Sequence, residues 1–249
     1  MDNTSYIALS RQQALWNQLE VIANNLANTN TTGFKSSDTL FAQYIQKVDS
    51  NDRTFKDKVA FTQDFGLVRN MDQGQFNPTG NTYDIAIQGD GYFVTEDPNG
   101  GSEEYTRAGN FTLNADGQLV AQSGRPVQSA TGGTITIPAE AEEIIIHGDG
   151  SVLDQNNIEV GRIRIVNFEN QRLLSRVGGT SFTTAPGQLP IDMDRPTVAQ
   201  GLLEASNVNG ISEMTRLISV NRAYADVSRI VQMEHERKTK AAEVFTRQV

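Results

Sequence analysis

Two amphipathic helical patterns at opposite ends of the chain constrain its fold more than any other feature. Within residues 5–28, large apolar side chains recur at the three- and four-residue spacing of one helix face, at Leu15, Leu19, Ile22 and Leu26. A second pattern follows residue 210, where the same spacing connects Leu217, Val220, Tyr224, Val227 and Val231. Because an apolar helix face is stable only when something covers it, each helix needs a partner elsewhere in the chain or on another molecule.

Polar turn residues mark the inner ends of both helices. The first helix is expected to end near Asn28, since the run of Asn and Thr that leads to Gly33 favours turns over a helix interior. The second is expected to be capped by Asn207 or Asn209, and Glu213 in its first turn suits the helix dipole. These segments separate the helical ends from the middle of the chain.

The middle of the chain has the period of β structure. From Tyr83 onward, short apolar runs alternate with the turn dipeptides Asp90-Gly91, Asp116-Gly117 and Asp149-Gly150. Residues 36–82 hold only short apolar stretches between polar residues, which indicates an extended connector that can include a β-hairpin.

The predicted fold is a mainly β central domain with long N- and C-terminal α-helices that form a coiled-coil-like terminal domain. Its segments are an N-terminal helix in 1–35, the connector in 36–82, an antiparallel β domain in 83–199 and a C-terminal helix in 200–249.

The charge of the chain lies on its middle. Residues 50–200 carry 20 acidic and 11 basic side chains, a net charge of −9, which equals that of the whole chain. The two helical ends are close to neutral, so they can pack closely against neighbours, whereas the acidic middle suits a surface. No basic footprint for nucleic acid is present.

Composition excludes several classes of protein. The sequence holds no apolar run of about 18 residues, so no membrane span is expected. The first residues lack the basic and apolar regions of a cleaved secretory signal. With no cysteine, disulfides, thiolate nucleophiles and cysteine-type zinc sites are all excluded.

No motif predicts a catalytic, cofactor or metal site. The two histidines, His147 and His235, lie in a β-turn context and on a charged helix end. Asp84, Asp90 and Asp97 lack the ligand order of a calcium-binding EF-hand loop. We therefore predict no enzyme, no cofactor and no small-molecule substrate.

The first helix is expected to need apolar partners on more than one of its sides. The entropy lost on ordering its backbone is about as large as the gain from burying all its large apolar side chains. We expect the helix to be frayed in a free monomer and ordered in a bundle. The alternative is a two-helix pair within one chain, which would still expose apolar surface. The expected packing residues are Leu15, Leu19, Ile22, Leu26, Leu217, Tyr224 and Val231.

Three stretches of the sequence resemble bacterial flagellar rod and hook proteins. The first runs from Ala23 to Lys35, the second covers short motifs between Thr79 and Val127, and the third runs from Gln200 to Tyr224. The positions that carry the family signature are Asn24, Asn25, Leu26, Asn28, Gly33, Phe34, Lys35, Ser206, Asn207 and Asn209.

Within this family, the opening residues favour one group. Met1, Asp2 and Asn3, with Tyr6 and Ala8, are more similar to proximal rod proteins than to distal ones, which are the second reading. Hook proteins are longer, because they carry an additional outer domain.

The resemblance implies a structural subunit of the flagellar basal-body rod, which spans the periplasm and transmits torque for motility. Such subunits pass through the flagellar type III export apparatus and assemble helically with copies of themselves and with other proximal and distal rod proteins. Their terminal helices form an inner tube, which would make 1–35 and 200–249 an inner terminal domain. The segments 24–35 and 206–209 would be hinges.

Two functions of other classes are alternatives. One is a secreted β-rich enzyme with helical appendages, such as a glycan hydrolase, which would need a pair of carboxylates at a defined separation. The other is a monomeric coiled-coil adaptor or type III effector. The enzyme reading does not account for the Asn-rich junctions at both helices.

Overall fold

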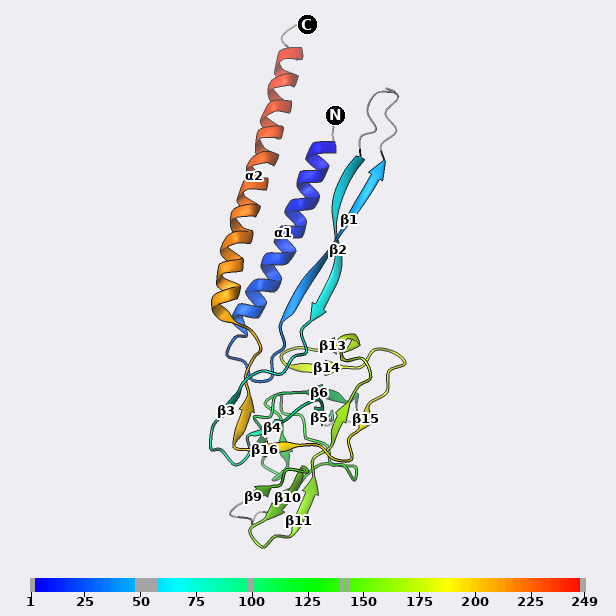
Figure 1. Ribbon diagram of the computed structural model, residues 1–249, viewed down its shortest axis with the longest axis vertical. Helices are drawn as coiled ribbons and strands as arrows, with labels where there is room; N and C mark the ends of the chain where they lie inside the picture. Colours follow the sequence, from blue (N-terminus) through cyan, green and yellow to red (C-terminus); the bar gives the residue numbers. More distant parts are fainter. Residues whose placement is uncertain (1–2, 48–57, 98–100, 139–140, 142–143, 247–249) are drawn as a thin grey trace. The chain divides into compact units, whose positions relative to one another are not determined.

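The computed structural model describes residues 3–47, 58–97, 101–138, 141 and 144–246 (Figure 1). Met1, Asp2 and residues 48–57 of the connector lie outside these ranges. The chain forms two compact units. The helical unit comprises Met1–Ala27, Ser37–Arg69 and Asn209–Val249, and the β unit comprises Asn28–Ser36 and Asn70–Val208. The chain therefore passes between the units four times.

The helical unit combines two helices with a long hairpin. Helix α1 (Asn3–Ala27) contacts both α2 (Gly210–Thr246) and the antiparallel hairpin of β1 (Ser37–Lys47) and β2 (Lys58–Arg69) (Figure 1). The prediction of a mainly β chain with a long helix at each end is confirmed. The β1–β2 hairpin is formed by residues of the predicted connector 36–82, which therefore packs against α1.

The two helices pack on each other within one chain. Leu15, Ile22 and Val220 are buried, and five partly buried side chains pack around them, namely Leu19, Leu217, Ala223, Tyr224 and Val227. The Tyr224 hydroxyl accepts a hydrogen bond from Gln12 Nε2 at 3.2 Å. The structure thus shows the intramolecular pair, in which α2 covers one apolar face of α1.

The C-terminal helix begins later than residue 200. Asn209 caps it, since its Oδ1 accepts from the Ser212 backbone N–H at 3.1 Å. Residues 202–204 form a strand, β17, which pairs with β3 (Phe76–Pro78). The predicted cap at Asn209 is therefore confirmed, and within the segment 200–249 the residues Leu202–Glu204 form a strand because they pair with β3.

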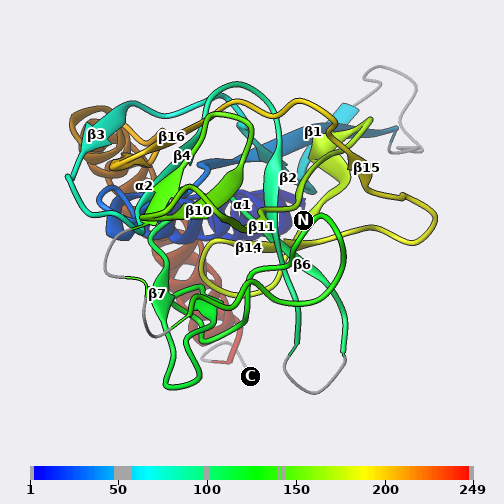
Figure 2. The same ribbon diagram turned by 90° about the horizontal axis from the view of Figure 1, so that it is seen from below.

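The β unit consists of short antiparallel strands. Its largest sheet has six, in the order β13-β14-β6-β5-β12-β15, and a three-stranded sheet has the order β11-β10-β9. Figure 2 labels β6, β14 and β15 of the first sheet and β10 and β11 of the second. The remaining pairs are β16-β4, β17-β3 and β7-β8. The bounds are β4 (Ile85–Ile87), β5 (Tyr92–Thr95), β6 (Glu104–Thr106), β7 (Thr112–Leu113), β8 (Leu119–Val120), β9 (Ile144–Ile146), β10 (Ser151–Asp154), β11 (Glu159–Arg162), β12 (Ile165–Asn167), β13 (Ser175–Arg176), β14 (Ser181–Thr183), β15 (Ile191–Asp192), β16 (Val198–Gln200) and β17 (Leu202–Glu204), with a 3-10 turn η1 (Gln171–Leu173).

Strand β5 separates two apolar cores. Successive side chains of a strand point to opposite faces. Phe93 packs edge-on against Phe111, at 5.0 Å between ring centroids, in the larger core. Tyr92 and Val94 belong to the second core, where Tyr92 meets Phe182 at 6.0 Å. Both faces of β5 are therefore buried, and three successive apolar residues, Tyr92–Val94, precede the buried Thr95 in this strand.

A pair of alanine substitutions tests the helix pairing. Ile22→Ala removes a side chain that is 1% exposed in the α1–α2 contact, and we expect it to lower the free energy of unfolding by about 2–4 kcal/mol. Leu9→Ala, on the same helix but 56% exposed, is expected to change it by less than about 0.5 kcal/mol. Urea unfolding followed by far-ultraviolet circular dichroism measures both. Equal effects would contradict the described packing.

Candidate functional site

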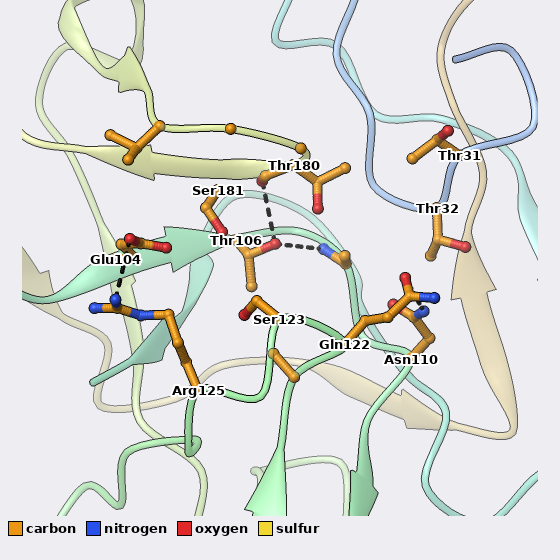
Figure 3. Close-up of a pocket in the computed structure, with 15 residues that line it drawn as sticks. Thr31, Thr32, Glu104, Thr106, Asn110, Gln122, Ser123, Arg125, Thr180 and Ser181 are labelled. Atoms are coloured by element: carbon orange, nitrogen blue, oxygen red, sulfur yellow. Dashed lines mark hydrogen bonds and ion pairs between the residues drawn. The ribbon is translucent and has the colours of Figure 1, made fainter. Parts of the chain in front are cut away.

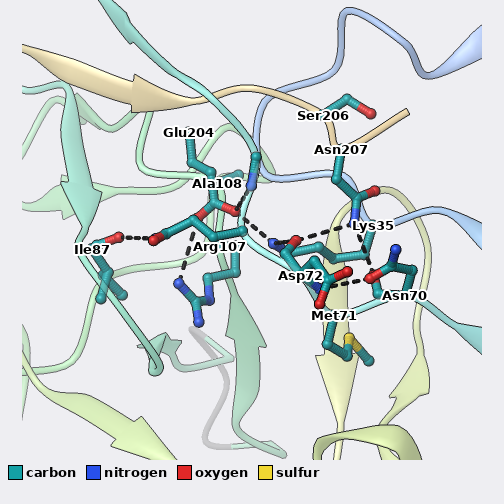
Figure 4. A network of polar contacts seen from close by, with 12 residues as sticks. Lys35, Asn70, Met71, Asp72, Ile87, Arg107, Ala108, Glu204, Ser206 and Asn207 are labelled. Atoms are coloured by element: carbon teal, nitrogen blue, oxygen red, sulfur yellow. Dashed lines mark hydrogen bonds and ion pairs between the residues drawn. The ribbon is translucent and has the colours of Figure 1, made fainter. Parts of the chain in front are cut away.

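Three segments of the β unit meet in one network of polar contacts (Figure 4). They are residues 33–36, 70–74 and 204–207, and Arg107 joins them from the loop after β6. We call these residues the junction network, because each segment lies next to a point where the chain passes between the units.

The carboxylate of Glu204 is the centre of the junction network. Its Oε1 lies 2.5 Å from Lys35 Nζ and accepts from the Gly74 N–H at 3.0 Å, and its Oε2 lies 3.4 Å from Arg107 Nη1. The side chains of Lys35, Arg107 and Glu204 are at most 2% exposed. Strand β17 fixes the position of Glu204, whose carbonyl also accepts from the Gly33 N–H at 2.8 Å.

Backbone carbonyls accept further hydrogen bonds from the two cations. Lys35 Nζ donates to the Asp72 carbonyl and Arg107 Nη1 to the Gly89 carbonyl, both at 2.8 Å. The Arg107 guanidinium lies over the Tyr92 ring at 5.0 Å. Burial lowers the pKa of Lys35 below its ordinary value, while the contact with Glu204 raises it. The carboxylate is therefore needed to keep two charges in a place that excludes water.

The Asn207 side chain binds all three segments. Its Oδ1 accepts from the Ser36 N–H at 2.8 Å, and its Nδ2 donates to the carbonyls of Asn70 at 2.9 Å and Asp72 at 3.1 Å. Its own N–H donates to the Phe34 carbonyl at 3.3 Å. Only an amide offers an acceptor and two donors in one short side chain, so asparagine is the residue that this position requires.

Phe34 and Gly33 fit against the framework of the β unit. The Phe34 ring is 1% exposed and lies under the Arg176 guanidinium at 4.4 Å. Gly33 has a φ of +68°, and a Cβ there would lie 2.4 Å from the Ala108 backbone nitrogen. Glycine is required on both grounds, conformation and space.

A second polar cluster lies in the helical unit, near the end of α1. The Asn25 side chain is 2% exposed, accepts from the Ser37 N–H at 3.0 Å and donates to the Ser37 carbonyl at 2.8 Å. It also donates to Glu213 Oε2 at 3.4 Å. Asn25 therefore joins the last turns of α1 to the start of β1 and the first turn of α2.

The remaining signature residues have local roles. Asn28 Oδ1 accepts from the Thr31 hydroxyl at 3.1 Å, Ser206 Oγ accepts from the Val208 N–H at 3.2 Å, and Asn209 caps α2. Asn24 is exposed and Leu26 is half-buried.

The expected helix-packing residues lie mostly in the contact between α1 and α2. Leu26 and Val231 are half-buried outside that apolar cluster, and the five that lie within it are Leu15, Leu19, Ile22, Leu217 and Tyr224.

Each helix also exposes apolar side chains that the described part of the chain leaves largely uncovered. Helical spacing places most of them away from the α1–α2 contact, whereas the Trp16 ring borders that contact, with its centroid 6.0 Å from that of Tyr224. All are more than half exposed: Tyr6, Leu9 and Trp16 on α1, and Ile211, Met214 and Ile218 on α2. We call these residues the outer faces.

Neither Glu204 nor Arg107 is among the site residues predicted from the sequence. Lys35 was the one residue that could have indicated them from the sequence, because a lysine next to a buried phenylalanine needs an acidic counter-ion.

Among the residues that the structure describes, no group of three or more histidine, cysteine or carboxylate side chains could hold a metal ion. No helix in the described ranges is long and apolar enough to cross a membrane.

Replacing the central carboxylate tests the junction network. Glu204→Gln leaves Lys35 and Arg107 buried without a counter-charge, and we expect the free energy of unfolding to fall by about 3–5 kcal/mol. The control Glu159→Gln removes a 3.7 Å ion pair with Arg162 whose partners are about half exposed, and should change it by less than about 0.5 kcal/mol. Chemical denaturation measures both; a small effect at Glu204 would refute its central role.

Two glycines with the same backbone conformation test the close approach at Gly33. Gly80 has a φ of +71° with open space around it, so Gly80→Ala should cost only the backbone strain of about 1–2 kcal/mol. Gly33→Ala must also displace the Ala108 backbone, which adds about 1–3 kcal/mol. Thermal unfolding compares the two variants, and equal melting temperatures would argue against the contact.

Comparisons with known proteins match most of the chain. Residues 6–35 match the family model "Flagella basal body rod protein", 86–153 match "Flagellar hook protein FlgE/F/G D1 domain", and 199–244 match "Flagellar basal body rod FlgEFG protein C-terminal". Each matched range supplies one member of the buried ion cluster, namely Lys35, Arg107 and Glu204.

Individual relatives cover nearly the whole chain. The flagellar basal-body rod protein FlgF of Caulobacter vibrioides is 39% identical over 243 residues, which is 98% of each chain. FlgF of Mesorhizobium japonicum is 35% identical over 93% of this chain and 92% of its own. The flagellar basal-body rod protein FlgG of Agrobacterium fabrum is 35% identical over 90% of this chain and 92% of its own. The chain belongs to the family of flagellar basal-body rod proteins, within its FlgF group.

Proposed function

We propose that this chain is a structural subunit of the proximal flagellar rod, which polymerises through its terminal helices into a torque-transmitting shaft across the periplasm. The observation that carries the proposal is the pair of outer faces, which expose apolar side chains along both α1 and α2. Contiguous exposed apolar surface marks a site of association. Membership of the rod protein family supports other rod subunits as partners, and we propose copies of this chain among them.

The proposed assembly uses two faces of each helix differently. Leu15, Ile22 and Val220 hold the two helices of one chain together, and the outer faces contact neighbouring subunits in a coiled-coil-like bundle. Leu26 and Val231, which are half-buried outside the α1–α2 cluster, extend the packing surface. The hairpin β1–β2 lies between neighbouring subunits and stiffens the shaft.

In this proposal the chain has no catalytic role, and it reaches the rod through the flagellar export apparatus. The buried charges of the junction network pair with each other, which is the pattern of a structural ion cluster. Passage through the flagellar type III export apparatus rests on family membership alone. The distal rod reading is less favoured, because the FlgF relative from C. vibrioides is 39% identical while the FlgG relative from the same species is 34% identical.

A charge on the outer face of α2 tests the proposal. Ile218→Asp would place a carboxylate against an apolar neighbour, and we expect at least about tenfold less of the chain in isolated basal bodies, with loss of swimming. The monomer should unfold with the same free energy, within about 0.5 kcal/mol. The measurements are motility on soft agar, immunoblots of basal bodies and urea unfolding.

The matched control adds the same charge one residue further along. Ser219 is exposed beside the outer face, and Ser219→Asp should leave both incorporation and swimming unchanged. Normal incorporation of Ile218→Asp would contradict assembly through this face, and equal losses for both variants would show a general effect of charge on α2.

A further inference from the structure

The β unit contains a cavity of about 460 Å³ that shares no residue with the junction network (Figure 3). Its walls come from Thr31 and Thr32, from β6 and the loop after it, from the turn at 121–125 and from the turn between β13 and β14. The cavity is of the size that small-molecule sites usually have. The proposed assembly through the outer faces gives it no role.

Four hydroxyl groups of the lining have no partner in the described part of the chain. They belong to Thr32, Ser123, Thr180 and Ser181. The Thr106 hydroxyl differs, because it donates to the Thr180 carbonyl at 3.2 Å and accepts from the Ala108 N–H at 3.0 Å. The four hydroxyls can each donate one hydrogen bond to a ligand and accept others from it.

Two side-chain amides stand next to these hydroxyls. Asn110 Nδ2 donates to Gln122 Oε1 at 3.2 Å, which fixes the orientation of both groups. Asn110 Oδ1 and Gln122 Nε2 then remain as one acceptor and one donor. Figure 3 shows both amides on the same side of the cavity as Thr32.

The charges of the lining neutralise each other. Arg125 pairs with Glu104 at 3.2 Å and also with Asp97 at 3.5 Å. A charged ligand would therefore find its counter-charge already paired, and an apolar ligand would leave the hydroxyls without water or partners. The described residues of the lining include no aromatic side chain, so recognition must come from hydrogen bonds.

We propose that this cavity binds a neutral saccharide of one or two rings. The hydroxyls of a sugar both donate and accept hydrogen bonds, which complements the four lining hydroxyls and the Asn110–Gln122 pair. Binding through hydrogen bonds without ring stacking implies millimolar affinity. A polar peptide from a partner subunit would meet the same groups through its backbone, and the test separates that outcome from the proposal.

The experiment titrates the purified, ¹⁵N-labelled full chain with maltose and, separately, with N-acetylglucosamine. Each is added to about 50 mM, which covers millimolar affinity, and glycerol at a matched hydroxyl concentration is the control. We expect saturable shifts confined to the backbone amides that line the cavity, among them those of Thr32, Ser123 and Thr180. Glycerol should cause only small, unsaturated changes.

Two variants locate the binding. Thr180→Val and Gln122→Leu each remove polar atoms at nearly constant size, and each should weaken binding by about two- to tenfold. Thr136→Val, at an exposed position outside the cavity, should leave it unchanged. Because the readout is a purified chain, it does not depend on assembly into a rod.

Several outcomes would overturn the proposal. These are no saturable shift with either sugar, shifts that glycerol reproduces, or binding that both cavity variants leave intact. Shifts of the lining amides on addition of unlabelled chain, but not of sugar, would identify a peptide site instead.

Discussion

The buried carboxylate of Glu204 is the interaction on which the rest of the β unit depends. Two cations and two backbone N–H groups from three other segments converge on this one residue, and Lys35 lies 169 positions away from it in the sequence. No one segment can satisfy these groups alone, so the network is complete only when all the segments are in place. Because an unpaired buried charge is costly, partly assembled forms of the network are unfavourable, and the site specifies one arrangement of the chain.

This constraint extends along the sequence to the start of the helices. Asn207 closes the junction network and Asn209, two residues later, caps α2. Asn25 performs a similar task within the helical unit, where it holds the start of β1 against the end of α1. Short amide side chains therefore cap the start of α2 and tie the end of α1 to β1.

Local patterns in the sequence predicted the parts of this structure that depend on neighbours in the chain. The helical period, the Asn209 cap and the β period need only a few adjacent residues to be visible. The pairing of Glu204 with Arg107 spans 97 positions, and no local pattern encodes a partner at that distance. Strand β17 was missed for the same reason, since three residues become a strand only through their pairing with β3. It was predictable from the sequence that Lys35 needs an acidic partner, but not which residue supplies it.

The helix pair changes the energetics of assembly. A helix that stayed frayed until it met its neighbours would lose its conformational entropy during association, and this loss would subtract from the affinity. In this chain, Leu15 and Ile22 already pack against Val220, so part of that entropy is lost on folding. The outer faces, with Trp16 and Ile218 more than half exposed, are then displayed on ordered helices. Association between subunits can therefore use apolar burial more completely, because the binding surface is organised before the neighbour arrives.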